Sequence, residues 1–174
     1  IEERLFANGK VHTNLNINNV KESCKHFIDE GVNSVAIAFM NAYSNKEHEL
    51  LAKKTLIENG FKGEISLSSL VSGEYREYER TTTTIIDAFV KARMSNYLDT
   101  LKNSLNDIGF KGSFLLTRSG SGSMTFDEAS ERPFETVMSG PVAGAEGAGE
   151  LSRKLKNTNM AVSYTHLRAH ETIA

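Results

Sequence analysis

The sequence has 174 residues, 39% of them hydrophobic and 24% charged, which is typical of a soluble globular protein of one domain, or one domain and part of another. The net charge of −2 excludes an electrostatic argument for binding nucleic acid or an acidic membrane. The single cysteine, Cys24, excludes an internal disulfide and fits a cytoplasmic protein. Neither a signal peptide nor an apolar run of about 18 residues is present. The first residue is Ile1, in a predicted strand, so we expect a fragment.

The first half of the sequence alternates predicted strands and helices. Residues 1–15 predict two short strands around the turn Asn8-Gly9. A helix is predicted up to Gly31, because Val20, Cys24, Phe27 and Ile28 form one apolar stripe. The apolar run 34–40 predicts a strand that is buried on both faces. A helix is predicted next, from a capping box at Ser44–Glu47 to about Asn59. We expect its Leu50, Leu51 and Leu56 to point inward. A strand is predicted over 64–69. This order predicts a parallel or mixed sheet.

The second half begins near Glu74 with a long predicted helix. There is no Gly or Pro between Gly73 and Gly109, and apolar residues recur at helical spacing, so we expect one helix, or two with a bend near Ala92. Four further elements are expected after it: a strand over 113–118, a Gly-Ser turn, a short helix capped by Thr125 and a strand beginning in "TNMAV".

The stretch "SGPVAG" predicts a helix start. Ser139 can cap the helix, and Pro141 suits its first turn because proline needs no N–H there. Gly140 and Gly144 permit close approach of a backbone or a ligand, and the free N–H groups of a helix start favour an anion. Spacing alone favours the alternative, which is tight packing of a helix rich in small residues.

The stretch "EYREYERTTTT" is unusual because charges precede four threonines. Glu74, Arg76, Glu77, Glu79 and Arg80 crowd seven positions, which local spacing alone assigns to a surface charge run. Four β-branched residues form helices poorly, however, so we expect tertiary contacts to hold this helix start. A buried arginine here needs a partner, and Glu77 or Glu79 could supply it.

The remaining motifs are weaker. The turn Ser119–Ser123 follows a strand, as phosphate-binding loops do, but it has neither a Walker lysine nor GxGxxG spacing, so a plain turn is favoured. His12, His26 and His48 are isolated along the chain. No triad order, Cys-His pair or CxxC motif is present.

Four stretches resemble the hydantoinase A / 5-oxoprolinase family. They are "GVNSVAIAFMNAYSNKEHE", "ISLSSLVSGEYREYERT", "EYREYERTTTTIIDAFV" and "YLDTLKNSLNDIGFKGSFLLTRSGSGSMTFDEASERPFETVMSGPVAGAEGAGE". The resemblance covers roughly residues 1–162, and its most specific parts are "REYERT" and "SGPVAG" in that order. One departure is "RSGSGS", where the family commonly has Ser-Asn-Gly-Gly, which leaves a role for Ser119–Ser123 open.

The resemblance implies an α/β fold, part of a two-lobed actin-like ATPase whose lobes are ribonuclease-H-like mixed sheets flanked by helices. It implies an ATP-dependent hydrolase of cyclic amides of the hydantoin or 5-oxoproline type, acting through a phosphorylated amide. ATP and Mg²⁺ are the implied cofactors of the parent protein, held by two acidic glycine-rich hairpins that this sequence lacks. The chain alone is therefore expected to be inactive and to bind neither tightly.

By position in the family motifs, we expect Ser139, Gly140 and Gly144 near the nucleotide cleft, and Arg76, Glu79 and Arg80 near the site between the lobes. The expected domains are residues 1–74, the end of the N-terminal lobe, and 75–162, the start of the second lobe. The expected partners are a cyclic amide and a second hydantoinase-type subunit or domain, with no nucleic acid and no membrane. The alternatives are a subunit of an ATP-dependent ketone carboxylase and an actin-like ATPase that activates or chaperones other proteins.

The last segment, 163–174, carries His166 and His170, which on a helix would share one face. Two nitrogens with no third ligand make a poor zinc site. The string "SYTHLRAHETIA" resembles translated sequencing adapter, so we expect a non-native tail that packs poorly, and no metal site.

Overall fold

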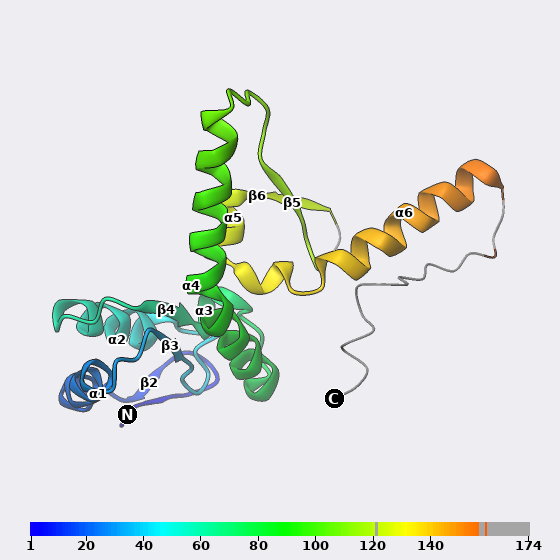
Figure 1. Ribbon diagram of the computed structural model, residues 1–174. Coiled ribbons are helices and arrows are strands. Elements are labelled where there is room, and N and C mark those ends of the chain that lie inside the picture. The colour runs from blue at the N-terminus through cyan, green and yellow to red at the C-terminus, as the bar shows by residue number, and fades with distance from the viewer. Residues whose placement is uncertain (121, 157–158, 160–174) are drawn as a thin grey trace, which may run out of the picture. The chain divides into compact units, whose positions relative to one another are not determined.

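The computed structural model describes residues 1–120, 122–156 and 159 (Figure 1). Its internal contacts divide the chain into two compact units. Of the described residues, the first unit comprises 1–112 and 126–134, and the second comprises those among 113–125 and those from 135 onwards. The predicted tail with His166 and His170 lies outside the described residues, as does most of the strand expected after Asn157. The family domain boundary near Glu74 stays a prediction, because compactness alone does not test it.

An N-terminal hairpin opens the first unit. Strands β1 (Arg4–Leu5) and β2 (Val11–Thr13) pair antiparallel. Gly9 has φ +79°, a conformation that favours glycine, and the Phe6 N–H donates to the Lys10 carbonyl at 2.9 Å. The hairpin predicted from Asn8-Gly9 is confirmed.

The parallel strand pair forms the centre of the first unit (Figure 1). Strands β3 (Ser34–Ile37) and β4 (Glu64–Leu67) pair in register from Ser34 opposite Glu64 to Ile37 opposite Leu67. Helix α2 (Glu47–Glu58) connects them, and α1 (Ile17–Asp29), capped by the Asn16 side chain, precedes them. The predicted helix–strand–helix–strand order and the parallel pairing are confirmed.

Two further helices follow β4. Helix α3 (Ser68–Val71) is a single turn, and α4 (Glu77–Asp107) is one continuous helix of 31 residues, the first of the two predicted alternatives. Helix α4 contacts both β3 and β4, and α5 (Phe126–Glu131) packs against α4 within the same unit.

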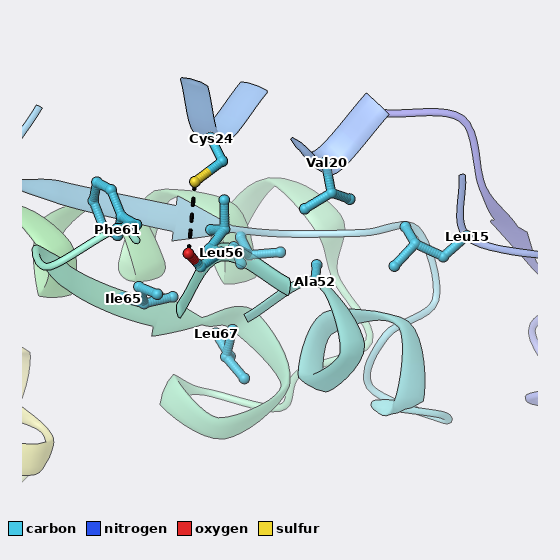
Figure 2. Close-up of a cluster of buried hydrophobic side chains, with 9 residues drawn as sticks. Leu15, Val20, Cys24, Ala52, Leu56, Phe61, Ile65 and Leu67 are labelled. Atoms are coloured by element: carbon cyan, nitrogen blue, oxygen red, sulfur yellow. Dashed lines mark hydrogen bonds between the residues drawn. The ribbon is translucent and has the colours of Figure 1, made fainter. Parts of the chain in front are cut away.

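The hydrophobic core lies between α1, α2 and one face of the strand pair (Figure 2). Cys24 is buried there, and its thiol lies 3.5 Å from the Leu56 carbonyl oxygen. The stripe predicted on α1 is confirmed at Val20 and Cys24, whereas Ile28 is 47% exposed. The core members are Leu15, Val20, Cys24, Ile37, Ala52, Leu56, Phe61, Ile65 and Leu67.

The prediction for α2 is wrong in two respects. The helix begins at Glu47, its N-cap is Lys46, and Ser44 makes no cap because its hydroxyl donates to the Asn41 carbonyl instead. Leu50 and Leu51 are 40% and 42% exposed, although Leu56 is buried as predicted. The inward face of α2 carries polar side chains that form hydrogen bonds in the interior. The buried residues of α2 are His48, Glu49, Ala52, Thr55 and Leu56.

The second unit contains an antiparallel hairpin and a helix. Strands β5 (Leu115–Thr117) and β6 (Ser123–Thr125) pair in register, and α6 (Ser139–Leu155) follows the short 3₁₀ helix η1 (Pro133–Thr136). None of the helices among the described residues combines the length and the apolar character needed to cross a bilayer.

Gly63 carries a stability prediction. A Cβ at this position would overlap the Asn33 carbonyl oxygen, which accepts the Glu64 N–H at 2.9 Å at the start of the β3–β4 ladder. Gly63→Ala should therefore destabilise the chain by about 1–3 kcal/mol, measured by urea unfolding. Gly147→Ala is the matched control, because a Cβ there meets nothing within 4 Å in α6. The control should be neutral or stabilising by about 0.5–1 kcal/mol, and equal effects at both positions would contradict the prediction.

Candidate functional site

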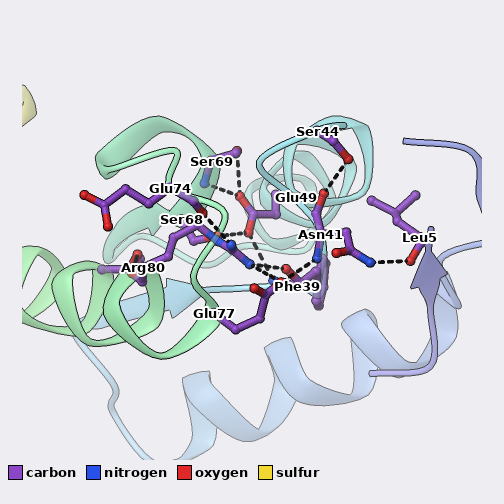
Figure 3. A network of polar contacts seen from close by, with 11 residues as sticks. Leu5, Phe39, Asn41, Ser44, Glu49, Ser68, Ser69, Glu74, Glu77 and Arg80 are labelled. Carbon is purple, nitrogen blue, oxygen red and sulfur yellow. Dashed lines mark hydrogen bonds and ion pairs between the residues drawn. The ribbon is translucent and has the colours of Figure 1, made fainter. Parts of the chain in front are cut away.

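Two parallel strands end side by side in the first unit, and the carboxyl ends of such strands are where ligands commonly bind in α/β proteins. Phe39 and Asn41 follow β3, while Ser68 and Ser69 follow β4. They form one hydrogen-bonded network with the buried side chains of Glu49 and Arg80 and the partly exposed Glu77, and we call this network the hub (Figure 3). The hub comprises Phe39, Asn41, Glu49, Ser68, Ser69, Glu74, Glu77 and Arg80.

Arg80, on the first turn of α4, is the centre of the hub. It is 1% exposed. Its Nε donates to Ser68 Oγ at 3.0 Å and its Nη1 to the Glu74 carbonyl at 2.7 Å. Its Nη2 donates to the Phe39 carbonyl at 3.0 Å and to Glu77 Oε1 at 3.1 Å. Four of the five guanidinium N–H groups are thus engaged by the protein.

Glu49, on α2, is the second buried charge. It is 0% exposed. Its Oε1 accepts from the Phe39 N–H at 3.1 Å and from Ser68 Oγ at 2.6 Å. Its Oε2 accepts from both the N–H and the hydroxyl of Ser69, at 2.9 and 2.7 Å. Glu49 therefore ties the end of β3 to the start of α3, and Ser68 links it to the guanidinium.

Glu77 closes the hub on the other side. Burial raises the pKa of its carboxyl, but the hydrogen bonds from Arg80 and from the Asn41 N–H at 2.9 Å outweigh burial, so its pKa lies below the ordinary value. Asn41 has φ +58°, and its side chain donates to the Leu5 carbonyl at 2.8 Å. The hub therefore also anchors the N-terminal hairpin.

The lowered pKa of Glu77 predicts an acid-dependent loss of stability. A carboxyl whose folded pKa is lowered stabilises the fold above its ordinary pKa of 4.5, and this stabilisation is lost as the pH falls through the folded value. In Glu77→Gln, the free energy of unfolding measured with urea should therefore fall less than in the original chain as the pH is lowered from 5 to below the folded pKa of Glu77. The matched control is Glu79→Gln, whose partner Arg76 lies at the surface. An unchanged acid dependence in Glu77→Gln would refute the linkage.

The structure separates the three residues predicted for the interlobe site. Arg80 lies inside the hub with Glu77 as its partner, one of the two partners predicted. Arg76 and Glu79 are exposed and pair with each other at 3.4 Å. The Tyr75 hydroxyl and the charge of Glu79 raise the pKa of Arg76. The contacts of Arg80 support a structural role in the hub, and a role for these three residues in catalysis stays a prediction.

Glu49, Ser68 and Ser69 are hub residues that the sequence analysis did not single out. The available signal was the resemblance itself, since "KEHE" ends one matching stretch and "ISLSS" begins the next. The hub brings both stretches together with "REYERT" in one network (Figure 3).

In the second unit, the turn after β5 meets the start of α6. Ser119 Oγ accepts from the Met138 N–H at 2.9 Å, and the Ser119 N–H donates to the Glu135 carbonyl at 2.6 Å. Arg118 forms an ion pair with Glu135. These contacts hold the β5–β6 turn against the segment that precedes α6. The hydrogen bonds of Ser119 with Glu135 and Met138 therefore give it a structural role.

The predicted cap at the start of α6 is wrong by one position. The N-cap is Met138, and Ser139 is the first helical residue with no side-chain capping bond. Pro141 lies in the first turn, as predicted. A Cβ at Gly140 would meet nothing within 4 Å, so the backbone at this helix start is open to a ligand, whereas Gly144 lies further along the helix. A role for Ser139, Gly140 and Gly144 at a nucleotide stays a prediction.

Comparison with solved structures defines the class of fold. An ATP-dependent caprolactamase from Pseudomonas jessenii superposes with a TM-score of 0.80 at 23% identity, over 90% of this chain and 23% of that one. A nucleotide-free acetone carboxylase superposes with a TM-score of 0.78, also at 23% identity, over 88% of this chain and 22% of the other. The chain therefore has the same mixed α/β fold as the matching parts of these two enzymes, and the predicted α/β class is confirmed.

Sequence comparison identifies the family. The profile described as "Hydantoinase/oxoprolinase" matches residues 80–163, and that of the "Hydantoinase/oxoprolinase N-terminal region" matches residues 1–60. The chain belongs to the hydantoinase/oxoprolinase family.

Its curated relatives carry several activities and are much longer. "Uncharacterized protein MJ0964" of Methanocaldococcus jannaschii is 34% identical over 94% of this chain and 24% of its own length. The acetophenone carboxylase gamma subunit of Aromatoleum aromaticum is 28% identical over 92% of this chain and 22% of its own. 5-Oxoprolinase 1 of Arabidopsis thaliana is 28% identical over 74% of this chain and 10% of its own. The chain spans about a quarter or less of these relatives' length.

Proposed function

We propose that this chain is a segment of a longer ATP-dependent hydrolase that opens cyclic amides of the hydantoin or 5-oxoproline type. The observation that carries the proposal is the match to both regions of the family, in order, on a chain whose hub joins Phe39 of the first region to Arg80 of the second. Relatives named 5-oxoprolinase and caprolactamase subunit alpha support a lactam-like substrate.

In this proposal the second unit contributes to the nucleotide site. The first-turn N–H groups of α6 favour an anion, and the open space at Gly140 permits close approach of a phosphate. In the family that this sequence resembles, two acidic glycine-rich hairpins hold ATP and its Mg²⁺, and this sequence lacks both, so the ligands of that Mg²⁺ would come from outside this segment. Transfer of the γ-phosphoryl group to the amide oxygen would then make the ring carbon open to attack by water.

The second candidate is a subunit of an ATP-dependent ketone carboxylase. The observation that favours it is similarity to the acetophenone carboxylase gamma subunit, at 28% identity, and to the acetone carboxylase beta subunit of Xanthobacter autotrophicus, at 24%. Both candidates involve a second hydantoinase-type subunit or domain as partner, consistent with relatives that are named as subunits.

The two candidates differ in the substrate that stimulates ATP turnover. The longer protein that contains this segment should release ADP when given hydantoin, 5-oxoproline or caprolactam, with ring-opened product in proportion. Stimulation by acetone or acetophenone with bicarbonate, and by none of the cyclic amides, would replace the first candidate with the second. ATP turnover that no compound of either class stimulates would overturn both.

The chain on its own should not turn over ATP. Phosphoryl transfer requires positioned acidic groups on Mg²⁺ together with donors on the phosphates, and the two acidic glycine-rich hairpins that supply them in the family are missing from this sequence. The 174-residue chain should therefore hydrolyse ATP at the rate of a buffer control, with and without magnesium. A magnesium-dependent rate well above that control, surviving repurification and lost in a Gly140→Trp variant, would contradict this expectation.

A further inference from the structure

The sequence contains two Asn-Gly pairs, Asn8-Gly9 and Asn59-Gly60. Asparagine is a thermolabile residue, and a glycine that follows it has no side chain to hinder attack of its backbone nitrogen on the asparagine amide. Both glycines have positive φ, +79° for Gly9 and +93° for Gly60. Because the two dipeptides are the same, their surroundings in the fold decide which asparagine reacts first.

The Asn59-Gly60 pair lies at the C-terminal end of α2, next to the hydrophobic core. Asn59 Nδ2 donates to the Thr55 carbonyl at 2.8 Å, and the Gly60 N–H donates to the Ile57 carbonyl at 3.1 Å. The next residue, Phe61, is 5% exposed and belongs to the core. Freeing both the Asn59 amide and the Gly60 nitrogen therefore requires the end of α2 to open beside a core side chain.

The Asn8-Gly9 pair lies at the exposed tip of the β1–β2 hairpin. Asn8 Oδ1 accepts from the Lys10 N–H at 3.1 Å, but no hydrogen bond within the described part of the chain holds Asn8 Nδ2, the group that would leave. The Gly9 N–H donates to the Phe6 carbonyl at 2.9 Å, and the Gly9 carbonyl accepts from Asn45 Nδ2 at 3.0 Å. Residues 6–10 are exposed apart from the half-buried Gly9, so opening this turn breaks a few hydrogen bonds and exposes no core side chain.

We propose that Asn8 is a site of spontaneous deamidation, and that opening of the hairpin turn sets its rate. In the open turn, the Gly9 nitrogen loses its proton and bonds to Asn8 Cγ, while the Cγ–Nδ2 bond breaks and the amide nitrogen leaves with that proton as ammonia. The product is a five-membered cyclic imide. Water is the only co-reactant of the next step, and the inference does not use the proposed ATP or cyclic-amide chemistry.

Water opens the imide at either of its two carbonyls, and the two products affect the hairpin differently. Opening at Cγ leaves an aspartate, which keeps an oxygen for the Lys10 N–H, and Asp-Gly suits the same kind of turn as Asn-Gly. Opening at the backbone carbonyl leaves an isoaspartate, whose main chain runs through Cγ and is one methylene longer. The longer segment no longer matches the turn in which the Phe6 N–H reaches the Lys10 carbonyl at 2.9 Å, so this product should loosen the β1–β2 pair.

Peptide mapping by mass spectrometry, after incubation of the chain at neutral pH, measures both sites in one sample. In concentrated urea, where the fold is absent, Asn8 and Asn59 should lose ammonia at similar rates. In native buffer, each rate being divided by its rate in urea, Asn8 should react about tenfold faster or more than Asn59, because its turn opens more often. Equal normalised rates in native buffer, or a faster reaction at Asn59, would overturn the proposal.

Asn45→Asp tests whether opening of the turn sets the rate. This substitution removes the donor to the Gly9 carbonyl but keeps an oxygen for the Glu47 N–H, which now donates to Asn45 Oδ1 at 2.9 Å. Deamidation at Asn8 should become about threefold to tenfold faster, while the rate at Asn59 should stay unchanged as the internal control. An unchanged rate at Asn8 would contradict control by the turn.

Amide hydrogen exchange tests the predicted effect of the isoaspartate. Chromatography of the modified chain separates its two products. In the isoaspartate form, the Phe6 amide should exchange about tenfold faster or more than in the original chain. The aspartate form and the variant Asn8→Asp, which has no amide to lose, control for the added charge and should exchange this amide as slowly as the original chain. Slow exchange at Phe6 in the isoaspartate form would refute the loosening of the hairpin.

Discussion

Arg80→Lys should destabilise the chain by about 2–4 kcal/mol, although it preserves the charge. A lysine has one nitrogen in place of a planar fork and cannot reach Ser68, Glu74, Phe39 and Glu77 together, as the guanidinium does. Acceptors left unpaired in the interior account for the loss. For a chain of this length, the melting temperature should fall by roughly 5–15 °C, measured by calorimetry or circular dichroism.

Arg76→Lys is the matched control for this substitution. Arg76 lies four positions earlier, is 60% exposed at its side chain and pairs with Glu79 at the surface, so its replacement should leave the melting temperature essentially unchanged. The competing hypothesis is that Arg80 binds substrate in the longer enzyme. It would be supported if Arg80→Lys kept the melting temperature and lowered turnover by about tenfold or more, which is about 1.4 kcal/mol.

Glu49→Ala should be the most damaging single substitution in the hub, with a loss of about 3–5 kcal/mol. It removes a fully buried carboxylate that accepts four hydrogen bonds and leaves the N–H groups of Phe39 and Ser69 without an acceptor. The end of β3 and the start of α3 should loosen together. Urea unfolding measures the loss, and faster amide exchange at Phe39 and Ser69 should accompany it.

Glu58→Ala on the same helix provides the control. Glu58 is exposed and pairs with Lys54 at 3.7 Å at the surface, so its loss should be close to neutral. If Glu49→Ala were as mild as Glu58→Ala, the hub would not hold the strand ends. A double-mutant cycle of Glu49→Ala with Arg80→Lys should show coupling, because Ser68 donates to one side chain and accepts from the other.

The sequence by itself determined the local elements of this protein. Asn8-Gly9 predicted the hairpin because few other dipeptides suit its turn, and the absence of Gly and Pro after Gly73 predicted one long helix, or two with a bend near Ala92. The alternation of helices with the strands predicted at 34–40 and 64–69 indicated a parallel or mixed sheet, and the two strands pair parallel. These features depend on the backbone preferences of a few adjacent residues, and those preferences can be inferred from the sequence alone. The four matching stretches, with "REYERT" and "SGPVAG" as their most specific parts, indicated the family, which the profile matches confirm.

Only the tertiary structure decided which helix faces point inward. Leu50 and Leu51 lie at the surface of α2 while Glu49 is buried, and on α4 Phe89 is 69% exposed while Asp87 is 0% exposed. Hydrophobicity predicts the opposite arrangement. A buried charge is stable where its partners converge on it, and those partners come from the ends of two strands and from another helix, at separations of 10 to 41 residues. Such convergence is a property of the packed chain, and no local pattern of residues contains it.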